Sequence, residues 1–204
     1  MSELPLIAVT DSASCPRPLP EQIERLTKLT QQSPQAVILR AKDIDREAYR
    51  SLAKSAQQLC TAASLPLILH SDWQLARELC INRLHLPLAL LRQIPACKRV
   101  HFPWLSTSVH SVDEALEAQG LGASVLIAGH IYATQCKAGL APRGLRFLHE
   151  VCKAVQLPVY AIGGIGFDAT QHAELRAQGA RGACVMSAYM RVQEFTFSRL
   201  TSTR

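Results

Sequence analysis

Aromatic residues are scarce in this sequence, since two Trp, four Tyr and five Phe make up 5% of its 204 residues. Hydrophobic residues nevertheless account for 48% of the chain, which excludes wholesale disorder. The core must therefore consist mainly of Leu, Ile, Val and Ala, as in proteins whose helices pack on a sheet. The length favours one domain, and we expect a single domain over residues 1–204.

Long hydrophobic runs are also missing. No stretch approaches the roughly 20 consecutive apolar residues of a membrane-spanning helix. The first residues, "MSELPLIAVTDSAS", have neither the basic start nor the long apolar stretch of a signal peptide. We therefore expect a cytoplasmic protein with no membrane partner.

Two further absences narrow the class of protein. The seven cysteines form no CxxC pair, which argues against a zinc knuckle or a redox centre and indicates reduced, mostly buried thiols. The formal charge is +6, yet the basic residues form no run and do not alternate with aromatics, as they tend to in single-strand binders. We expect no nucleic-acid partner, because attraction of a small anionic substrate explains the excess charge as well.

Short apolar runs recur along the chain, and a polar stretch with helical spacing follows each of them. Eight runs are typical of buried strands: 6–10, 36–40, 67–70, 83–86, 105–109, 124–129, 159–164 and 183–187. Boundary residues support the helices between them, with Asp43 and Asp168 as N-caps and Gly120 and Gly179 at helix ends. This rhythm predicts a (β/α)8 TIM barrel, with a doubly wound open sheet as the alternative.

In such a barrel the active site lies at the carboxyl ends of the strands. Nearly every predicted strand end carries polar residues or glycine, although each alone could be ordinary loop chemistry. The candidates are Thr10, Asp11, Arg40, Lys42, Ser71, Asp72, His85, Ser108, His110, His130, Thr134, Lys137, Gly163, Gly164 and Ser187. Their convergence on one rim is the reason to consider them together.

The last two strand ends predict a phosphate site. "AIGGIG" follows the seventh run and "VMSA" follows the eighth, where TIM barrels commonly bind phosphate. Because glycine has no Cβ, the backbone at Gly163 and Gly164 can approach an anion. Backbone around Met186 and Ser187 would complete the phosphate-binding site. The alternative is that the glycine pair only makes a tight turn.

Two other segments carry positive charge toward the same rim. In "GHIYATQCKAG" a hydroxyl, Thr134, and an ammonium, Lys137, lie in a loop long enough to fold over an anion, although both could simply be solvated. Arg40 and Lys42 share one face of an extended segment. Two adjacent cations repel unless an anion joins them, so we expect a carboxylate or phosphate beside them.

The segments "LRAKD", "STSVHSVDEA", "GHIYATQCKAGLAPRG", "YAIGGI" and "GACVMSA", in this order, resemble the thiamine phosphate synthase/TenI family over most of the chain. "GHIYATQCKAGLAPRG" and "RLHLP" are the closest matches, and they are more similar to the TenI branch, the thiazole tautomerases. The synthases of the family use Mg²⁺ held by an Asp in an Asn-Asp pair after the third strand and by another Asp after the fourth.

This sequence departs from the synthase pattern at both metal positions. The first pair reads Ser71-Asp72, and "HLPLALLR" in the second region has no carboxylate. A hard divalent cation needs several oxygen ligands, and a lone carboxylate does not supply them. We therefore expect no metal and no cofactor. The tautomerase branch needs none, because it aromatises a thiazole carboxylate phosphate by moving one proton.

The resemblance assigns the proton transfer to His110, the histidine of the Ser-Val-His segment. Imidazole titrates near neutral pH and can both take and deliver a proton. An isolated histidine at a strand-to-helix corner is otherwise more often a cap. The resemblance instead favours a catalytic role for His110. His130 is the second candidate for the acid/base, and His85 is expected to face the pocket without acting.

The sequence-based hypothesis is therefore a thiazole tautomerase, an isomerase acting on a small phosphorylated thiazole. Arg40 and Lys42 hold the carboxylate, Lys137 closes the loop, and the remaining substrate contacts come from Ser108, Thr134, Gln135 and Cys136. We expect a homo-oligomer. The alternatives are a thiamine phosphate synthase with an altered metal site and a non-catalytic sensor of a thiamine intermediate.

Overall fold

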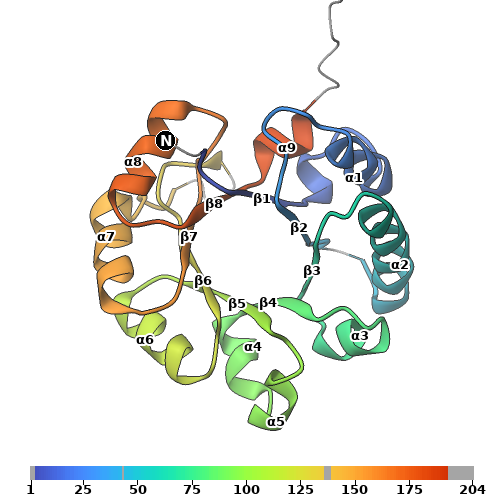
Figure 1. The fold of residues 1–204 in the computed structure, drawn as a ribbon, viewed down its shortest axis with the longest axis horizontal. Helices are drawn as coiled ribbons and strands as arrows, with labels where there is room; N and C mark the ends of the chain where they lie inside the picture. The colour runs from blue at the N-terminus through green and yellow to red at the C-terminus, as the bar shows by residue number, and fades with distance from the viewer. Residues whose placement is uncertain (1–2, 43, 136–138, 193–204) are drawn as a thin grey trace, which may run out of the picture.

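The computed structural model describes residues 3–42, 44–135 and 139–192, and these form a closed barrel of eight parallel strands in sequential order (Figure 1). The strands are β1 (Leu6–Val9), β2 (Ala36–Leu39), β3 (Leu67–His70), β4 (Arg83–Pro87), β5 (Trp104–Val109), β6 (Val125–Gly129), β7 (Val159–Ile162) and β8 (Gly182–Val185). β1 pairs with β8 and closes the ring, so the TIM barrel prediction is confirmed and the open sheet is excluded.

The strands are apolar on both faces because each separates two cores. Ile7, Ile38, Ile68 and Ile127 pack with their neighbours inside the barrel. The alternate residues pack outward with the helices in a larger cluster. This two-sided burial explains why the strands appear in the sequence as continuous apolar runs rather than as alternating patterns.

Helices surround the barrel on the outside (Figure 1). They are α1 (Leu19–Thr27), α2 (Arg46–Ala62), α3 (Trp73–Glu78), α4 (Leu88–Gln93), α5 (Ala96–Arg99), α6 (Val112–Gly120), α7 (Gly144–Ala154), α8 (Ala169–Ala177) and α9 (Ser187–Arg191), with a 3-10 turn at Ser12–Ser14. None of these helices is both long and apolar enough to cross a membrane, within the described ranges.

The helix boundaries follow the expected cap chemistry with two differences. Asp168 accepts a hydrogen bond from Gln171 N and caps α8, as predicted. The cap of α2 is Asp45, which accepts from Ala48 N, whereas the predicted Asp43 lies outside the described residues. Gly179 follows α8 with φ 95°, but after α6 the left-handed residue is Gly122 rather than Gly120.

β7 and β8 end two residues before their apolar runs do. The run 159–164 ends as a strand at Ile162, because Gly163 and Gly164 have φ values of 104° and 68° and turn the chain away. The run 183–187 ends at Val185, and Ser187 begins α9. Gly163, Gly164 and Met186 therefore lie beyond the strand ends at the barrel rim, and Ser187 is the first residue of α9.

Candidate active site

The carboxyl ends of the parallel strands meet at one rim of the barrel, where enzymes of this fold hold their active sites. Side chains along a strand alternate between the interior and the helices. Ile38 of β2 and Ile68 of β3 belong to the interior cluster. Two residues further along, Arg40 and His70 therefore face the interior at the rim.

Arg40 has an anionic partner within the chain. Its Nη1 donates a hydrogen bond of 2.6 Å to Asp11 Oδ1, at the end of β1. Burial alone would raise the pKa of Asp11, but hydrogen bonds from Ser14 and Arg40 and the charge of Arg40 outweigh it and lower that pKa. Asp11 thus supplies an anion for Arg40, while the neighbouring Lys42 is exposed.

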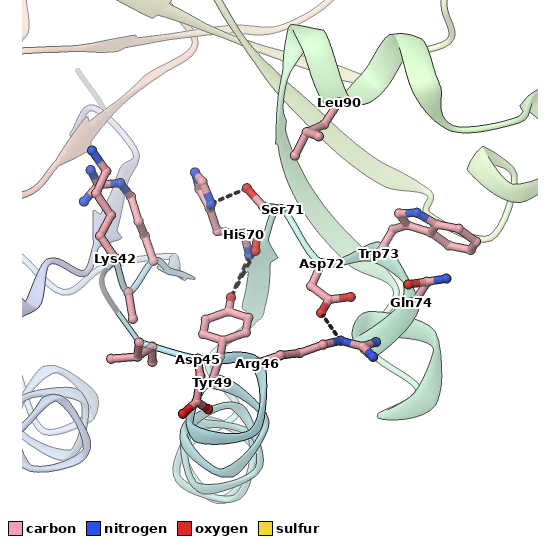
Figure 2. Close-up of a pocket in the computed structure, with 13 residues that line it drawn as sticks. Lys42, Asp45, Arg46, Tyr49, His70, Ser71, Asp72, Trp73, Gln74 and Leu90 are labelled. Atoms are coloured by element: carbon pink, nitrogen blue, oxygen red, sulfur yellow. Dashed lines mark hydrogen bonds and ion pairs between the residues drawn. The ribbon is translucent and has the colours of Figure 1, made fainter.

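A cavity of about 580 Å³ opens at the ends of β2 and β3, between the first turns of α2 and α3 (Figure 2). Its lining combines charged, hydroxyl and aromatic side chains: Arg40, Ala41, Lys42, Ile44, Asp45, Arg46, Tyr49, His70, Ser71, Asp72, Trp73, Gln74 and Leu90. Arg40 and Lys42 are the predicted substrate-binding residues in this lining; the others that the structure describes lie elsewhere on the rim.

Both oxygens of the Asp72 carboxylate already accept hydrogen bonds within the protein. Its Oδ1 accepts from Leu75 N at 2.8 Å and caps α3, and its Oδ2 accepts from Arg46 Nε at 3.0 Å. Over the described ranges, no group of three or more His, Cys, Asp or Glu side chains could hold a metal ion. The residues present do not fit the magnesium site that the synthase pattern implies.

His85 on β4 forms a buried polar network with β5. Its Nδ1 and Nε2 lie 3.0 Å from Ser106 Oγ and Ser108 Oγ respectively. Ser106 Oγ also donates to Leu84 O, so His85 Nδ1 carries the proton and Nε2 accepts from Ser108. Burial, followed by electrostatic interaction with His70 and Arg40, lowers the pKa of His85 to about 3. His85 is thus a neutral residue that orients Ser108.

His70 at the end of β3 was missed by the sequence reasoning. Its Nδ1 lies 2.7 Å from Ser71 Oγ, and its ring centroid is 5.3 Å from that of His85. Burial, followed by the charges of Arg40 and Lys42, lowers the pKa of His70 to about 4. The available signal was an imidazole in the last position of the apolar run "LILH", where the interior of the barrel meets its rim.

His110 lies just beyond β5 and bridges to the next strand. Its ring Nδ1 lies 2.6 Å from Gly129 O at the end of β6, and its backbone N donates to Glu114 Oε2 at 2.6 Å. A carbonyl oxygen can only accept, so Nδ1 carries a proton in this contact and Nε2 has the free lone pair. The position at a strand-to-helix corner matches the prediction.

His130 follows Gly129 directly and is 6% exposed. Its Nε2 is buried and has no hydrogen-bond partner among the residues of the described ranges. The two candidate histidines for proton transfer are thus linked through Gly129, whose carbonyl contacts the His110 ring.

Gly163 and Gly164 make close backbone contacts with the loop after β6. A Cβ at Gly163 would lie 2.3 Å from His130 Cβ, and one at Gly164 would lie 2.4 Å from Ala133 O. This packing requires glycine at both positions whether or not a phosphate binds there. It also brings the predicted phosphate-binding backbone against the loop that carries Thr134.

The remaining predicted residues lie on the same rim. Met186 and Ser187 follow β8, and both are partly exposed. Thr134 is partly buried, and Gln135 is exposed. The predicted contacts at Cys136 and Lys137 lie outside the described residues.

Comparison with known proteins gives a consistent assignment. The family model described as thiamine monophosphate synthase matches residues 6–189. A thiamine-phosphate synthase of Listeria monocytogenes is 37% identical over 147 residues, which cover 70% of this chain and 67% of the relative. A thiamine-phosphate synthase of Desulfitobacterium hafniense is 32% identical over 158 residues, covering 74% and 73%.

Among solved structures, the thiamine phosphate pyrophosphorylase of Pyrococcus furiosus is similar with a TM-score of 0.75 and 24% identity, covering 93% of this chain and 89% of that one. This likeness supports the barrel fold. The match of the family model and the identity to the curated relatives go further: the chain belongs to the thiamine monophosphate synthase/TenI family of thiamine biosynthesis.

Proposed function

We propose that the protein is a thiazole tautomerase, which aromatises a thiazole carboxylate phosphate by moving one proton. The observation that carries the proposal is the contact of 2.6 Å between His110 Nδ1 and Gly129 O. With Nδ1 protonated, Nε2 can take a proton from the substrate and return it at another position. The resulting imidazolium would keep its hydrogen bond to the carbonyl, which stabilises the charged intermediate state.

His110 is held both at its ring and at its backbone. Gly129 O accepts from one ring nitrogen, and the Glu114 carboxylate accepts from the His110 backbone N. Glu114 is itself held by its backbone N, which donates to Ser111 Oγ. Such restraint suits a group that must reach two substrate positions without reorienting. His130, buried beside the same carbonyl, is retained as the second candidate for one of the two proton transfers.

The substrate contacts follow from the arrangement of the rim. Arg40 and Lys42 would hold the carboxylate at the β2–β3 cavity. Backbone at Gly163, Gly164, Met186 and Ser187 would bind the phosphate, as loops after the seventh and eighth strands do in other TIM barrels. Ser108, Thr134, Gln135 and Cys136 are proposed to contact the thiazole, and Lys137 to close over it.

A thiamine phosphate synthase is the second candidate, and the names of the curated relatives favour it. The lack of suitable metal ligands favours the tautomerase, which needs no metal. The one carboxylate at the family's metal position, Asp72, already accepts hydrogen bonds from Arg46 and Leu75 N. Formation of thiamine phosphate from the pyrimidine diphosphate and the thiazole phosphate would support the synthase. Binding of the thiazole carboxylate phosphate without turnover would instead support a sensor.

Replacement of His110 by Gln tests the assignment of the proton carrier. Glutamine keeps a polar side chain but cannot exchange a proton near neutral pH. We expect the rate constant for aromatisation to fall by about 10²- to 10⁴-fold, with the exposed His101→Gln variant unchanged as a control. An unaltered rate in His110→Gln would remove His110 from the mechanism.

A further inference from the structure

We propose that His70 completes the anion site formed by Arg40 and Lys42, and that its uncharged imidazole makes this site select a single carboxylate over a doubly charged phosphate or diphosphate. The inference deepens the proposed function, on which the identity of the carboxylate ligand rests. It adds a specificity-determining residue to the rim.

The three side chains line one cavity, and His70 occupies its inner part. Figure 2 shows the His70 ring between the side chains of Lys42 and Ser71. The backbone of His70 is held on both sides by Tyr49, whose hydroxyl accepts from His70 N at 3.1 Å and lies 3.2 Å from His70 O. Its position is therefore fixed before any ligand binds.

Ser71 orients the imidazole through a strained backbone. Its φ of 69° lies in the left-handed region, which a serine rarely adopts. Its backbone N donates to His85 O at 2.9 Å, and its Oγ lies 2.7 Å from His70 Nδ1. If the hydroxyl donates to Nδ1, the proton of the neutral ring is on Nε2, which becomes a donor toward the cavity.

The charges around the cavity are too few to balance a dianion. Its lining contains the cations Arg40, Lys42 and Arg46 and the carboxylates Asp45 and Asp72, which leaves a net charge of +1. Asp11, outside this lining, pairs with Arg40, with the Arg40 and Asp11 side chains 20% and 13% exposed, and brings the net charge of these groups to zero. A dianion would therefore exceed the positive charge that the cavity offers.

His70 does not supply the missing charge. Burial and the neighbouring cations keep its pKa at about 4, so at neutral pH it donates a hydrogen bond without becoming positive. Titratable and charged groups surround His70 on several elements. Asp11 follows β1, Arg40 and Lys42 follow β2, and β4 carries His85. Tyr49 lies in α2, and Asp72 caps α3. A permanently charged residue in place of His70 would accept the dianion.

Calorimetric binding of two probes tests the proposal: the aromatic thiazole carboxylate phosphate and the same compound without its carboxylate. We expect His70→Leu to weaken binding of the first probe by about tenfold and to leave the second unchanged. His70→Gln, which keeps a donor, should bind the first probe within about threefold of the wild type. The exposed His149→Leu is the matched control. Equal weakening of both probes, or of neither, would overturn the proposal.

A second readout separates this inference from the proposed function. Thiazole-2-carboxylate and inorganic pyrophosphate are titrated into the wild-type protein while the ring signals of His70 are followed by NMR. The carboxylate should shift these signals more strongly and at lower concentration than pyrophosphate does. This result without any aromatisation activity would contradict the tautomerase and leave the carboxylate site standing, whereas tighter binding of pyrophosphate would refute the carboxylate site itself.

Discussion

The rim of the barrel has two arcs of different construction. The polar arc, defined as Asp11, Arg40, His70, His85 and Ser108, consists of side chains from β1 to β5 or just beyond their ends. Asp11 bonds to Arg40, His85 bonds to Ser108, and the His70 and His85 ring centroids lie 5.3 Å apart. The glycine arc, defined as Gly129, Gly163 and Gly164 at the ends of β6 and β7, consists of backbone packed too closely for a Cβ. His110 joins the arcs through its bond to Gly129.

The two arcs should differ in their tolerance of substitution. In the polar arc, the chemistry depends on charge and protonation, so conservative substitutions should change binding while the barrel survives. In the glycine arc, any side chain collides with the neighbouring loop, so substitution should damage the fold before it changes the chemistry.

Gly163→Ala should have the largest effect. The new Cβ would lie 2.3 Å from His130 Cβ, and the φ of 104° is unfavourable for alanine. Strain and overpacking together predict a loss of about 4 kcal/mol in the free energy of unfolding, measured by denaturant titration. Gly166→Ala in the same loop is the matched control, because nothing lies within 4 Å of its added Cβ. Equal stability of the two variants would contradict the account of the glycine arc.

Acidification should weaken the polar arc next. The pKa of His70 falls from 6.5 in the unfolded chain to about 4 in the fold. Between these values the unfolded chain binds a proton that the folded chain does not, so stability decreases as pH falls from 6.5 toward 4. His70 alone should account for roughly 3 kcal/mol.

Thermal unfolding of the wild type and His70→Gln at pH 7 and pH 4.5 measures this contribution. The variant should lose less stability than the wild type on acidification, because glutamine does not titrate. The His149→Gln variant should follow the wild type, since His149 is exposed. If all three proteins respond alike, His70 is not a buried neutral imidazole.

Asp11→Asn should have a smaller effect on stability. The substitution removes the negative partner of a half-buried guanidinium, Arg40, and should cost about 2 kcal/mol. It should also raise the affinity of the β2–β3 cavity for pyrophosphate, because Arg40 is no longer compensated. Calorimetry measures both effects, with the exposed Glu3→Gln as the control. Unchanged pyrophosphate affinity would show that Asp11 does not set the charge of the site.

The sequence predicted the barrel because its signals are local. Apolar runs such as 36–40 and 67–70 mark strands buried on both faces, and their regular alternation with amphipathic stretches implies parallel pairing. The same local reasoning located Arg40 and His110 at strand ends, because a strand end can be identified from the residues beside it.

Longer-range features of the site could not be predicted in this way. The ion pair of Asp11 with Arg40 joins residues 29 apart in the sequence, and its geometry depends on how β1 pairs with β2. His70 ended an apolar run and gave only a weak signal of function. The requirement for glycine at 163 depends on contact with His130, which only the closed barrel brings about.

We propose that the reaction at this rim is proton transfer by His110 without a metal. The most direct test incubates the wild-type protein with the thiazole carboxylate phosphate, with and without a chelator, and separately with the pyrimidine diphosphate, thiazole phosphate and Mg²⁺. The account predicts aromatisation at the same rate in both chelator conditions and no thiamine phosphate. Mg²⁺-dependent formation of thiamine phosphate without aromatisation would contradict it.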